Sequence, residues 1–243
     1  MISVINLLYE KNKENTSMYI NKKNYWLELG CLDIILKKFL IKSRINIFKI
    51  FLENVKFDKS SKILDVGTTP LPDSHENIIF QQYKWRNNIT GFSNQDCNIL
   101  NKKFKSNKFI KGDGTNIKLK KNSFHISFCS ATIEHVGSYK NQKKLISELF
   151  RVSKNYIFLT TPHRGFPIDL HTKIPLIHLL PKTIHRRILK FIGLGYFALE
   201  KNLNLLFPKD IIKICKTLKI ENYKIVYNKF AFLKSNIILI IKK

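Results

Sequence analysis

The stretch SKILDVGTTP, residues 61–70, decides the fold class of this chain. Its apolar run ends at Val66, with Asp65 near the end and Gly67 in the turn that follows, so it predicts a buried β-strand that opens into a loop. In an open α/β sheet, ligands bind beyond the carboxyl ends of the strands. A glycine there lets the backbone approach a ligand, and an aspartate binds an ammonium group or a hydroxyl. By itself, the stretch is equally consistent with a strand that ends in an ordinary turn.

Short apolar segments alternate with helical ones downstream, which is typical of βαβ units and a parallel sheet. A crossover helix is predicted over 141–152, where Leu145, Leu149 and Val152 share one face, and Pro208 suits the first turn of a later helix. The predicted strands are residues 62–66, 88–92, 108–111, 124–129 and 156–160, with a closing pair over 223–227 and 235–241.

Two segments depart from this alternation. Residues 1–58 are rich in Asn and Lys at first and then carry apolar residues at helical spacing, so we expect an N-terminal extension of one or two helices. The main domain is predicted over residues 59–243. Within it, three prolines break the regularity over about 163–207, which predicts a helical insertion there.

The charge of the chain is its most unusual bulk property. Its 243 residues include 43 Lys and Arg against 17 Asp and Glu, a formal net charge of +26, which favours nucleic acid or an anionic membrane as a partner. However, 37 of the basic residues are Lys, beside 35 Ile and 23 Asn, and these three residues share A/T-rich codons. We therefore interpret most of the charge as compositional drift, because phosphate sites favour the bidentate fork of Arg.

The four cysteines show no zinc-binding spacing, so we expect reduced thiols and no structural metal. The N-terminal residues lack the pattern of a secretory signal, and no stretch of 18 apolar residues is present. These observations predict a cytoplasmic protein and leave peripheral contact with the inner membrane surface open.

Two later segments follow the first stretch in a recognisable order. They are GDGTNIKLKKNSFHISFCSATIEHVG, residues 112–137, and ELFRVSKNYIFLTTPHR, residues 148–164. Together with residues 61–70 they resemble the class I S-adenosylmethionine-dependent methyltransferases of the small-molecule, type 11-like branch. The resemblance implies a Rossmann-like fold with a mostly parallel seven-stranded sheet and an antiparallel closing strand. It also implies S-adenosylmethionine (SAM) as cofactor and a small-molecule acceptor, with a saccharide or a lipid-linked precursor as candidates.

The resemblance also assigns a cofactor site to this chain. The sequence departs from the family pattern in two places. Thr69 and Leu71 replace the second and third glycines of the family's first loop. Ser93 replaces the acid that usually binds ribose, and the next acid along the chain is Asp96. A threonine at positive φ would be strained, so either the loop takes another path or the site has lost affinity. The implied cofactor residues are Asp65, Gly67, Thr68, Thr69, Ser93, Asp113, Gly114, Ser130 and Ala131.

The acceptor side is expected just beyond the fourth and fifth strands. His135, beside Glu134, is the candidate general base; the alternative is a structural pair that caps the next helix. His163, Arg164 and His171 are candidate acceptor contacts, because loops at this edge usually shape the acceptor site and Arg binds anionic groups. The alternative for each is a solvated loop residue.

Residues 173–197 combine an apolar face with basic side chains at Lys182, Arg186, Arg187 and Lys190. Such a helix lies on an anionic membrane, here through residues 182–194, or forms a lid over the acceptor site; we favour the lid, because amphipathicity most often reports core packing. Two rival functions remain for the chain: a catalytically inactive methyltransferase-like scaffold, and a nucleic-acid methyltransferase. The absence of an NPPY-type motif for a flipped base disfavours the second.

Overall fold

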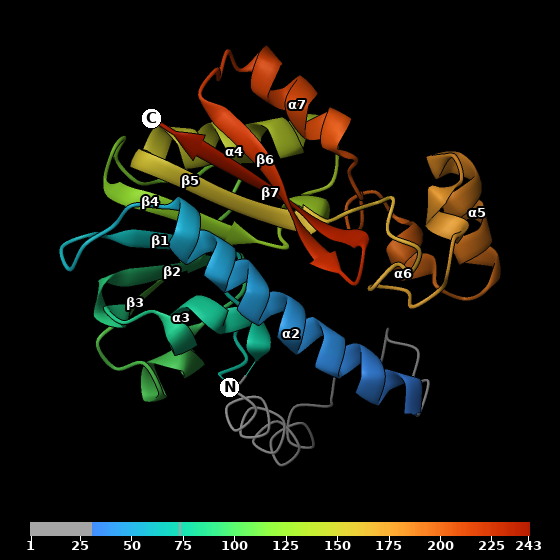
Figure 1. Ribbon diagram of the computed structural model, residues 1–243, viewed down its shortest axis with the longest axis horizontal. Coiled ribbons are helices and arrows are strands. Elements are labelled where there is room, and N and C mark those ends of the chain that lie inside the picture. Colours follow the sequence, from blue (N-terminus) through green and yellow to red (C-terminus); the bar gives the residue numbers. More distant parts are fainter. Residues whose placement is uncertain (1–30, 73) are drawn as a thin grey trace.

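The computed structural model describes residues 31–72 and 74–243, with side chains from residue 36 onward (Figure 1). Expectations about residues 1–30 lie outside the described residues. Within the described part of the chain, no helix is both long enough and apolar enough to cross a bilayer.

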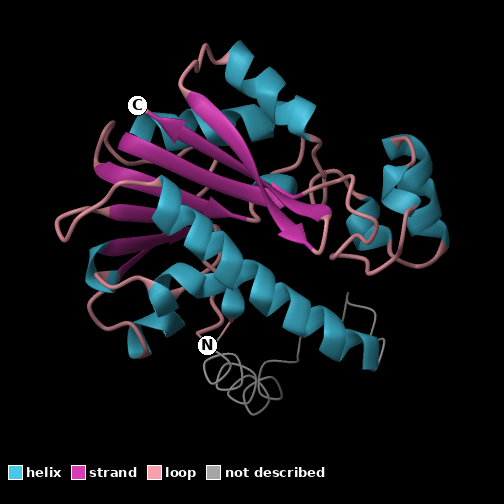
Figure 2. Cartoon of the chain, viewed as in Figure 1, coloured by secondary structure: helices cyan, strands magenta, loops and turns pink. Residues whose placement is uncertain are grey.

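A single seven-stranded sheet forms the middle layer of the protein (Figure 2). The strand order is β3-β2-β1-β4-β5-β7-β6, and the first five pair in parallel, whereas β7 is antiparallel to both of its neighbours. The predicted fold class, with its antiparallel closing strand, is confirmed. The strands are β1 (Ile63–Val66), β2 (Ile89–Ser93), β3 (Lys108–Lys111), β4 (Phe124–Ser130), β5 (Ser153–Pro162), β6 (Tyr223–Phe230) and β7 (Leu233–Lys242).

Helices cover both faces of the sheet. One face packs α4 (Tyr139–Val152) and α7 (Pro208–Thr217) onto the apolar side chains of the central strands. The other packs α2 (Cys31–Asn54) and the short α3 (Ile78–Gln82). Each of the central strands is buried on both faces, which explains why strands such as β1 are continuously apolar apart from Asp65.

The long helix α2 also contacts the last two strands through a buried polar network. Ser43 donates a hydrogen bond to Asn236 Oδ1 at 3.1 Å and accepts one from Asn228 Nδ2 at 2.7 Å. Asn46 Nδ2 donates to Asn228 Oδ1 at 2.6 Å. Because buried amides and hydroxyls are costly unless paired, this network fixes where α2 lies across the sheet.

The segment between β5 and α7 forms a separate helical lobe at one end of the sheet, drawn at the right of Figure 1. It holds a one-turn helix (Ile177–Leu179), α5 (Lys182–Phe191) and α6 (Gly195–Ala198). Its own small core contains Leu189, Phe197 and Leu203. We call residues 163–207 the insertion.

Candidate functional site

The loops after β1 and β4 meet at the point where the strand order reverses. The chain runs from β1 outward to β2 and β3, then returns to β4 on the other side of β1. Loop residues 67–72 and 131–138 therefore leave the same edge of the sheet in opposite directions. Ligands of open α/β sheets bind at such a switch point, so we call these two loops the switch-point site.

Asp65 places a buried carboxyl group at this site. The side chain is only 6% exposed, and its Oδ2 accepts a hydrogen bond from the Thr68 hydroxyl at 2.7 Å. Burial raises the pKa of Asp65 to about 7, although the Thr68 hydrogen bond and the charge of Arg44 oppose the rise. A carboxyl group in this environment gains free energy from an added cationic partner, which suits it to bind an ammonium group.

The loop after β1 follows a path that avoids the strain expected at Thr69. Gly67 has a φ of +100°, while Thr69 is not among the residues with positive φ. The backbone N–H of Thr69 donates to Asn77 Oδ1 at 3.2 Å, and the Asn77 amide donates back to the carbonyls of Thr69 and Leu71 at 3.0 and 2.9 Å. A buried asparagine thus fixes a loop that the family usually builds from glycines.

Arg44 enters the same site from helix α2, and the sequence analysis did not identify it. Its Nη1 donates to Ser130 Oγ at 2.5 Å, and Ser130 shares a second hydrogen bond with the Thr160 hydroxyl at 3.0 Å. The next residue, Ala131, has a φ of +52° and donates its N–H to the Thr160 carbonyl at 2.9 Å. The one available signal in the sequence was that Arg44 is the first arginine of a lysine-dominated chain.

The residues predicted to hold the adenosine lie together at the ends of β2 and β3. The Gly112 N–H donates to the Ser93 carbonyl at 2.7 Å, which brings Ser93 beside Asp113. Ser93 is buried and its hydroxyl accepts from the Gln95 N–H at 3.2 Å. Asp113 is exposed, and its carboxylate accepts from the Thr115 N–H at 2.8 Å.

Two neighbouring residues frame this part of the site. A β-carbon on Gly114 would lie 3.0 Å from Leu145 Cδ1, so this glycine allows the loop to lie close against α4. Asp96, the nearest acid after Ser93, is exposed and accepts a hydrogen bond from the Asn98 N–H at 2.9 Å. It therefore stabilises the following turn.

The insertion contributes a buried histidine and aspartate pair. His171 Nδ1 lies 3.0 Å from Asp169 Oδ1, and the Thr172 hydroxyl donates to Asp169 Oδ2 at 2.9 Å. Burial opposes both charges, but the hydrogen bonds and mutual attraction outweigh it: the pKa of Asp169 lies well below its usual range, and that of His171 is raised.

His171 lies beside Glu134 and His135, the two residues predicted on the acceptor side. The His135 and His171 rings meet edge to face, with centroids 5.0 Å apart. Glu134 is fully buried, and its Oε2 accepts from the Thr161 hydroxyl at 2.8 Å. His135 is exposed, and its Nδ1 lies 2.7 Å from the Asn202 carbonyl. The sequence separation between His135 and His171 gave no sign of this contact.

The two candidates directly after β5 make local contacts. Arg164 is buried and donates from Nε to the His178 carbonyl at 3.0 Å and from Nη2 to the Leu180 carbonyl at 2.7 Å. Burial lowers the pKa of Arg164. His163 Nδ1 accepts from the Gly165 N–H at 2.8 Å. Arg164 thus connects the insertion to the end of β5.

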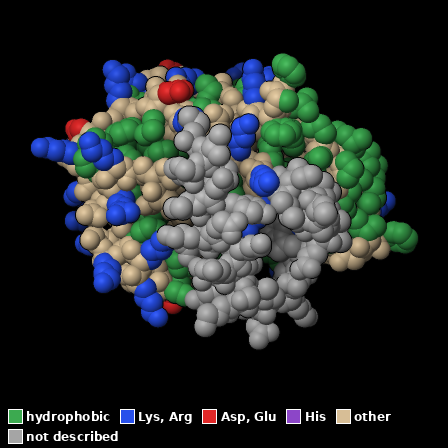
Figure 3. Space-filling view, turned by 60° about the horizontal axis from the view of Figure 1, so that its bottom comes forward, with side chains coloured by type: hydrophobic (Ala, Val, Ile, Leu, Met, Phe, Trp, Pro, Cys, Tyr) green, Lys and Arg blue, Asp and Glu red, His purple; other side chains and the backbone are tan. Residues whose placement is uncertain are grey.

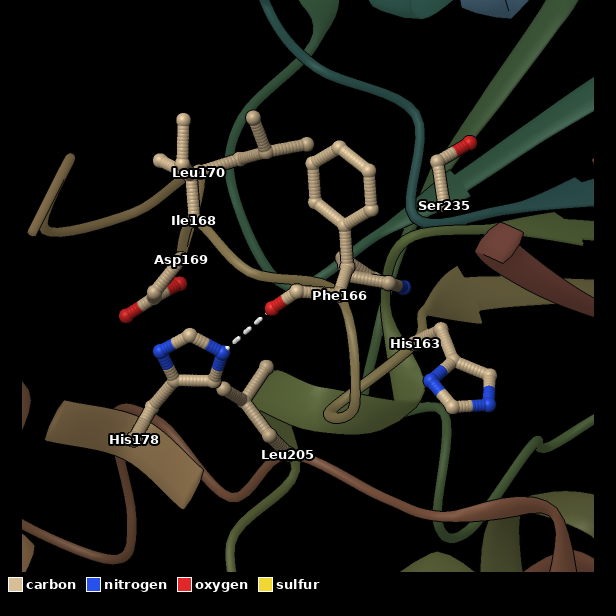
Figure 4. Close-up of a pocket in the computed structure, with 9 residues that line it drawn as sticks. His163, Phe166, Ile168, Asp169, Leu170, His178, Leu205 and Ser235 are labelled. Atoms are coloured by element: carbon tan, nitrogen blue, oxygen red, sulfur yellow. Dashed lines mark hydrogen bonds between the residues drawn. The ribbon is translucent and has the colours of Figure 1, made fainter. Parts of the chain in front are cut away.

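A small pocket lies between the end of β5 and the insertion (Figure 4). It encloses about 210 Å³, part of it open to solvent, and the His178 Nε2–H donates to the Phe166 carbonyl at 2.7 Å along its wall. Its lining consists of Pro162, His163, Phe166, Ile168, Asp169, Leu170, His178, Leu205 and Ser235.

Comparison with known proteins identifies the domain that carries this site. Residues 64–157 match the family model described as a methyltransferase domain. No curated protein matches the chain in sequence.

Many solved structures share the fold at low identity. A SAM-dependent methyltransferase from Thermotoga maritima, described as a possible histamine N-methyltransferase, has a TM-score of 0.56 at 13% identity over 86% of this chain and 92% of that chain. Magnesium protoporphyrin IX methyltransferase from Synechocystis, solved with SAH, has a TM-score of 0.57 at 13% identity over 89% and 90%. A SAM-dependent methyltransferase from Aquifex aeolicus has a TM-score of 0.57 at 15% identity over 85% and 96%.

Residues 64–157 thus match a methyltransferase domain, in agreement with the predicted resemblance, and the chain shares its fold with solved S-adenosylmethionine-dependent methyltransferases.

Proposed function

We propose that this chain binds SAM at the switch-point site and transfers its methyl group to a small-molecule acceptor. The observation that carries the proposal is the pair of opposite charges at that site. The amino-acid end of SAM carries an ammonium group and a carboxylate. Asp65 is a buried acid that a cation would stabilise. The Arg44 guanidinium lies nearby and donates a hydrogen bond to Ser130 Oγ at 2.5 Å. Asp65 would bind the ammonium and Arg44 the carboxylate.

The adenosine end of SAM would lie along the ends of β2 and β3. Ser93 offers a hydroxyl in place of the usual acid, and Asp113 offers a carboxylate that is exposed. This substitution exchanges a charged acceptor for a neutral one, so ribose binding contributes less than in relatives that keep the acid. The amino-acid end of SAM therefore carries a larger share of its affinity.

The reaction is an in-line displacement at the methyl carbon. A lone pair of the acceptor forms the new bond to carbon, the carbon–sulfur bond breaks, and its electron pair neutralises the sulfonium. An alcohol acceptor must also lose a proton, and His135, exposed at the same edge, is the proposed base. A nitrogen acceptor with a free lone pair needs positioning alone.

Isothermal titration of the full chain with SAM and with its demethylated product tests the proposal. We expect a single site in the wild type and about tenfold or weaker binding in Asp65→Asn, because a charge-assisted contact is lost. Asp96→Asn is the matched control, because Asp96 is an exposed acid at the same edge of the sheet. Absence of binding in the wild type, or unchanged affinity in both Asp65→Asn and Asp113→Asn, would contradict the proposal.

The surface of the insertion supports an acceptor that is held at a membrane. Helix α5 buries only His185 and Leu189, whereas Phe191 is 92% exposed. Figure 3 shows hydrophobic side chains gathered at the end of the molecule that Figure 1 assigns to α5 and α6. The exposed apolar residues of this lobe are Leu176, Leu179, Leu180, Ile184, Phe191, Ile192, Tyr196 and Leu199.

Exposed Arg187 and Lys190 accompany this apolar surface, so apolar and cationic groups face solvent together. Anionic lipid headgroups with acyl chains beneath them complement that combination. A lid closing on its own core would bury these apolar residues, so the lobe is better suited to contact a membrane. We therefore place the protein at the inner membrane surface, with contact through residues 182–194 and a lipid-linked acceptor.

A further inference from the structure

Three side chains with metal-binding atoms converge next to the switch-point site. Glu134 and His135 follow β4 directly, and His171 comes from the insertion. One candidate ligand atom from each lies within 4.8 Å of the other two. Bonds of about 2.1 Å in a tetrahedral zinc site put ligand atoms about 3.4 Å apart, so metal binding requires the three side chains to move together slightly.

Both imidazoles are oriented by their other nitrogen. His171 Nδ1 is held by Asp169 at 3.0 Å, and His135 Nδ1 is held by the Asn202 carbonyl at 2.7 Å. These contacts leave the Nε2 atom of each ring for a further partner. A carboxylate or a backbone carbonyl behind a histidine is the usual support of a metal-ligating imidazole.

The buried carboxyl group of Glu134 also favours a bound cation. The residue is fully buried, and the Thr161 hydroxyl donates to Oε2, but Oε1 has no hydrogen-bond partner among residues 31–72 and 74–243. A buried carboxylate oxygen without a partner costs free energy that a bound cation would recover. A carboxylate oxygen of Glu134 lies within 4.8 Å of a ring nitrogen of both His135 and His171.

We propose that Glu134, His135 and His171 bind one divalent transition-metal ion through a carboxylate oxygen and two imidazole nitrogens. Two nitrogens and one oxygen suit Zn²⁺ or Co²⁺ and do not suit Mg²⁺, which prefers oxygen ligands and keeps its waters. Three protein ligands leave a coordination position open. This departs from the expectation of no metal, which rested on the absence of zinc-binding spacing at the cysteines.

The open coordination position of the ion indicates the chemical class of the methyl acceptor. This inference rests on the proposed function. An oxygen atom of the acceptor, from a hydroxyl or a carboxylate, would occupy it and be held beside the switch-point site. A bound alcohol loses its proton to water more readily next to a divalent cation, so in the metal-bound form the ion, in place of His135 as base, would assist an O-methylation.

Metal binding is tested on the full, tag-free chain without SAM. After treatment with a chelator, the protein is dialysed against Zn²⁺, Co²⁺ or Mg²⁺, and bound metal and the visible absorption of Co²⁺ are measured. We expect one equivalent of Zn²⁺ or Co²⁺ and none of Mg²⁺. Glu134→Gln and His135→Ala should weaken binding about hundredfold, and Asp169→Asn about tenfold because it only orients His171. His125→Ala, at the opposite end of β4, should bind as the wild type does.

The variants also separate a metal site from a purely structural hydrogen-bond cluster. His135 is exposed, so His135→Ala is expected to fold, and circular dichroism checks this. If the wild type binds no Zn²⁺ or Co²⁺, or if His135→Ala and Glu134→Gln bind as His125→Ala does, the proposal is wrong. Because SAM is absent, a failed SAM titration would leave this result intact, and the reverse also holds.

Discussion

Gly67 and Thr132 approach so closely that a β-carbon on residue 67 would lie 1.9 Å from the Thr132 hydroxyl oxygen. The Thr132 hydroxyl in turn donates to the Val66 carbonyl at 3.2 Å. This contact joins the loop after β1 to the loop after β4, so the two halves of the switch-point site depend on each other. Only glycine meets both the steric limit and the φ of +100°.

The first prediction concerns this contact. Gly67→Ala should lower the free energy of unfolding by about 3 kcal/mol or more, since it adds a steric clash to an unfavourable φ. Gly193→Ala is the matched control, because Gly193 also has a positive φ, +82°, with nothing within 4 Å of its added β-carbon. It should cost about 1 kcal/mol. Urea unfolding of both variants measures the difference, and equal losses would contradict the steric argument.

The second prediction concerns the pH dependence of stability at Asp65. Its pKa is about 7 in the folded protein against 3.8 ordinarily, so the folded state binds more protons between these values. Stability contributed by the protonated group is therefore lost as pH rises from about 4 to 7, by up to about 4 kcal/mol at ~1.4 kcal/mol per unit. Urea unfolding of wild type and Asp65→Asn at pH 5 and 8 tests this; the variant should lack this part of the slope. An equal change in the free energy of unfolding between pH 5 and 8 in the two proteins would refute the prediction.

The third prediction concerns Arg44. Arg44→Ala should weaken SAM binding about tenfold or more, because a charge-assisted contact with the carboxylate is lost, and Arg44→Lys should recover part of it. Arg86→Ala is the control, since Arg86 is exposed in the one-turn helix Arg86–Asn88 that precedes β2. Titration calorimetry provides the affinities. Tighter binding in Arg44→Ala would mean that the arginine competes with SAM for the site.

The fourth prediction concerns the buried ion pair of the insertion. Asp169→Ala should lower the free energy of unfolding, measured with a chelator present, by about 3 kcal/mol, because it leaves His171 buried without its partner. Glu221→Ala, at an exposed acid, should change stability by less than about 0.5 kcal/mol. Similar effects in the two variants would show that the pair contributes little.

The fifth prediction concerns membrane contact. Cosedimentation with phosphatidylglycerol vesicles should exceed that with phosphatidylcholine vesicles. Phe191→Ser should weaken vesicle binding about thirtyfold, since a buried aromatic side chain contributes about 2 kcal/mol. Leu52→Ser is the control, because Leu52 is 44% exposed on α2. Equal binding by the two variants, or no binding by the wild type, would remove the support for a membrane-held acceptor.

The strands could be predicted from the sequence because both faces of a central parallel strand are buried, which leaves short, continuously apolar runs. β3, predicted over 108–111, spans those residues in the structure. The carboxyl ends of β5 and β6 were predicted too short, since Thr161 and Pro162 of β5 and residues 228–230 of β6 pair with β7 beyond the apolar run. Backbone pairing at those positions leaves no periodic signal.

The site could be predicted only where its residues follow a strand directly. Asp65 and Gly67 belong to one motif, whereas Asn77 acts on the loop from a later helix and Arg44 from an earlier one. The contact of His171 with Glu134 and His135 depends on how the insertion folds back over the sheet. Such contacts are set by packing between distant segments, and no local pattern encodes them.

The polar network between α2 and the final hairpin also has a consequence for biosynthesis. Ser43 bonds to Asn236, 193 residues later in the chain. A ribosome releases α2 long before β6 and β7, so the hydrogen bonds of α2 to Asn228 and Asn236 cannot form until the hairpin has been made. The helix that carries Arg44 therefore gains this support only late in synthesis.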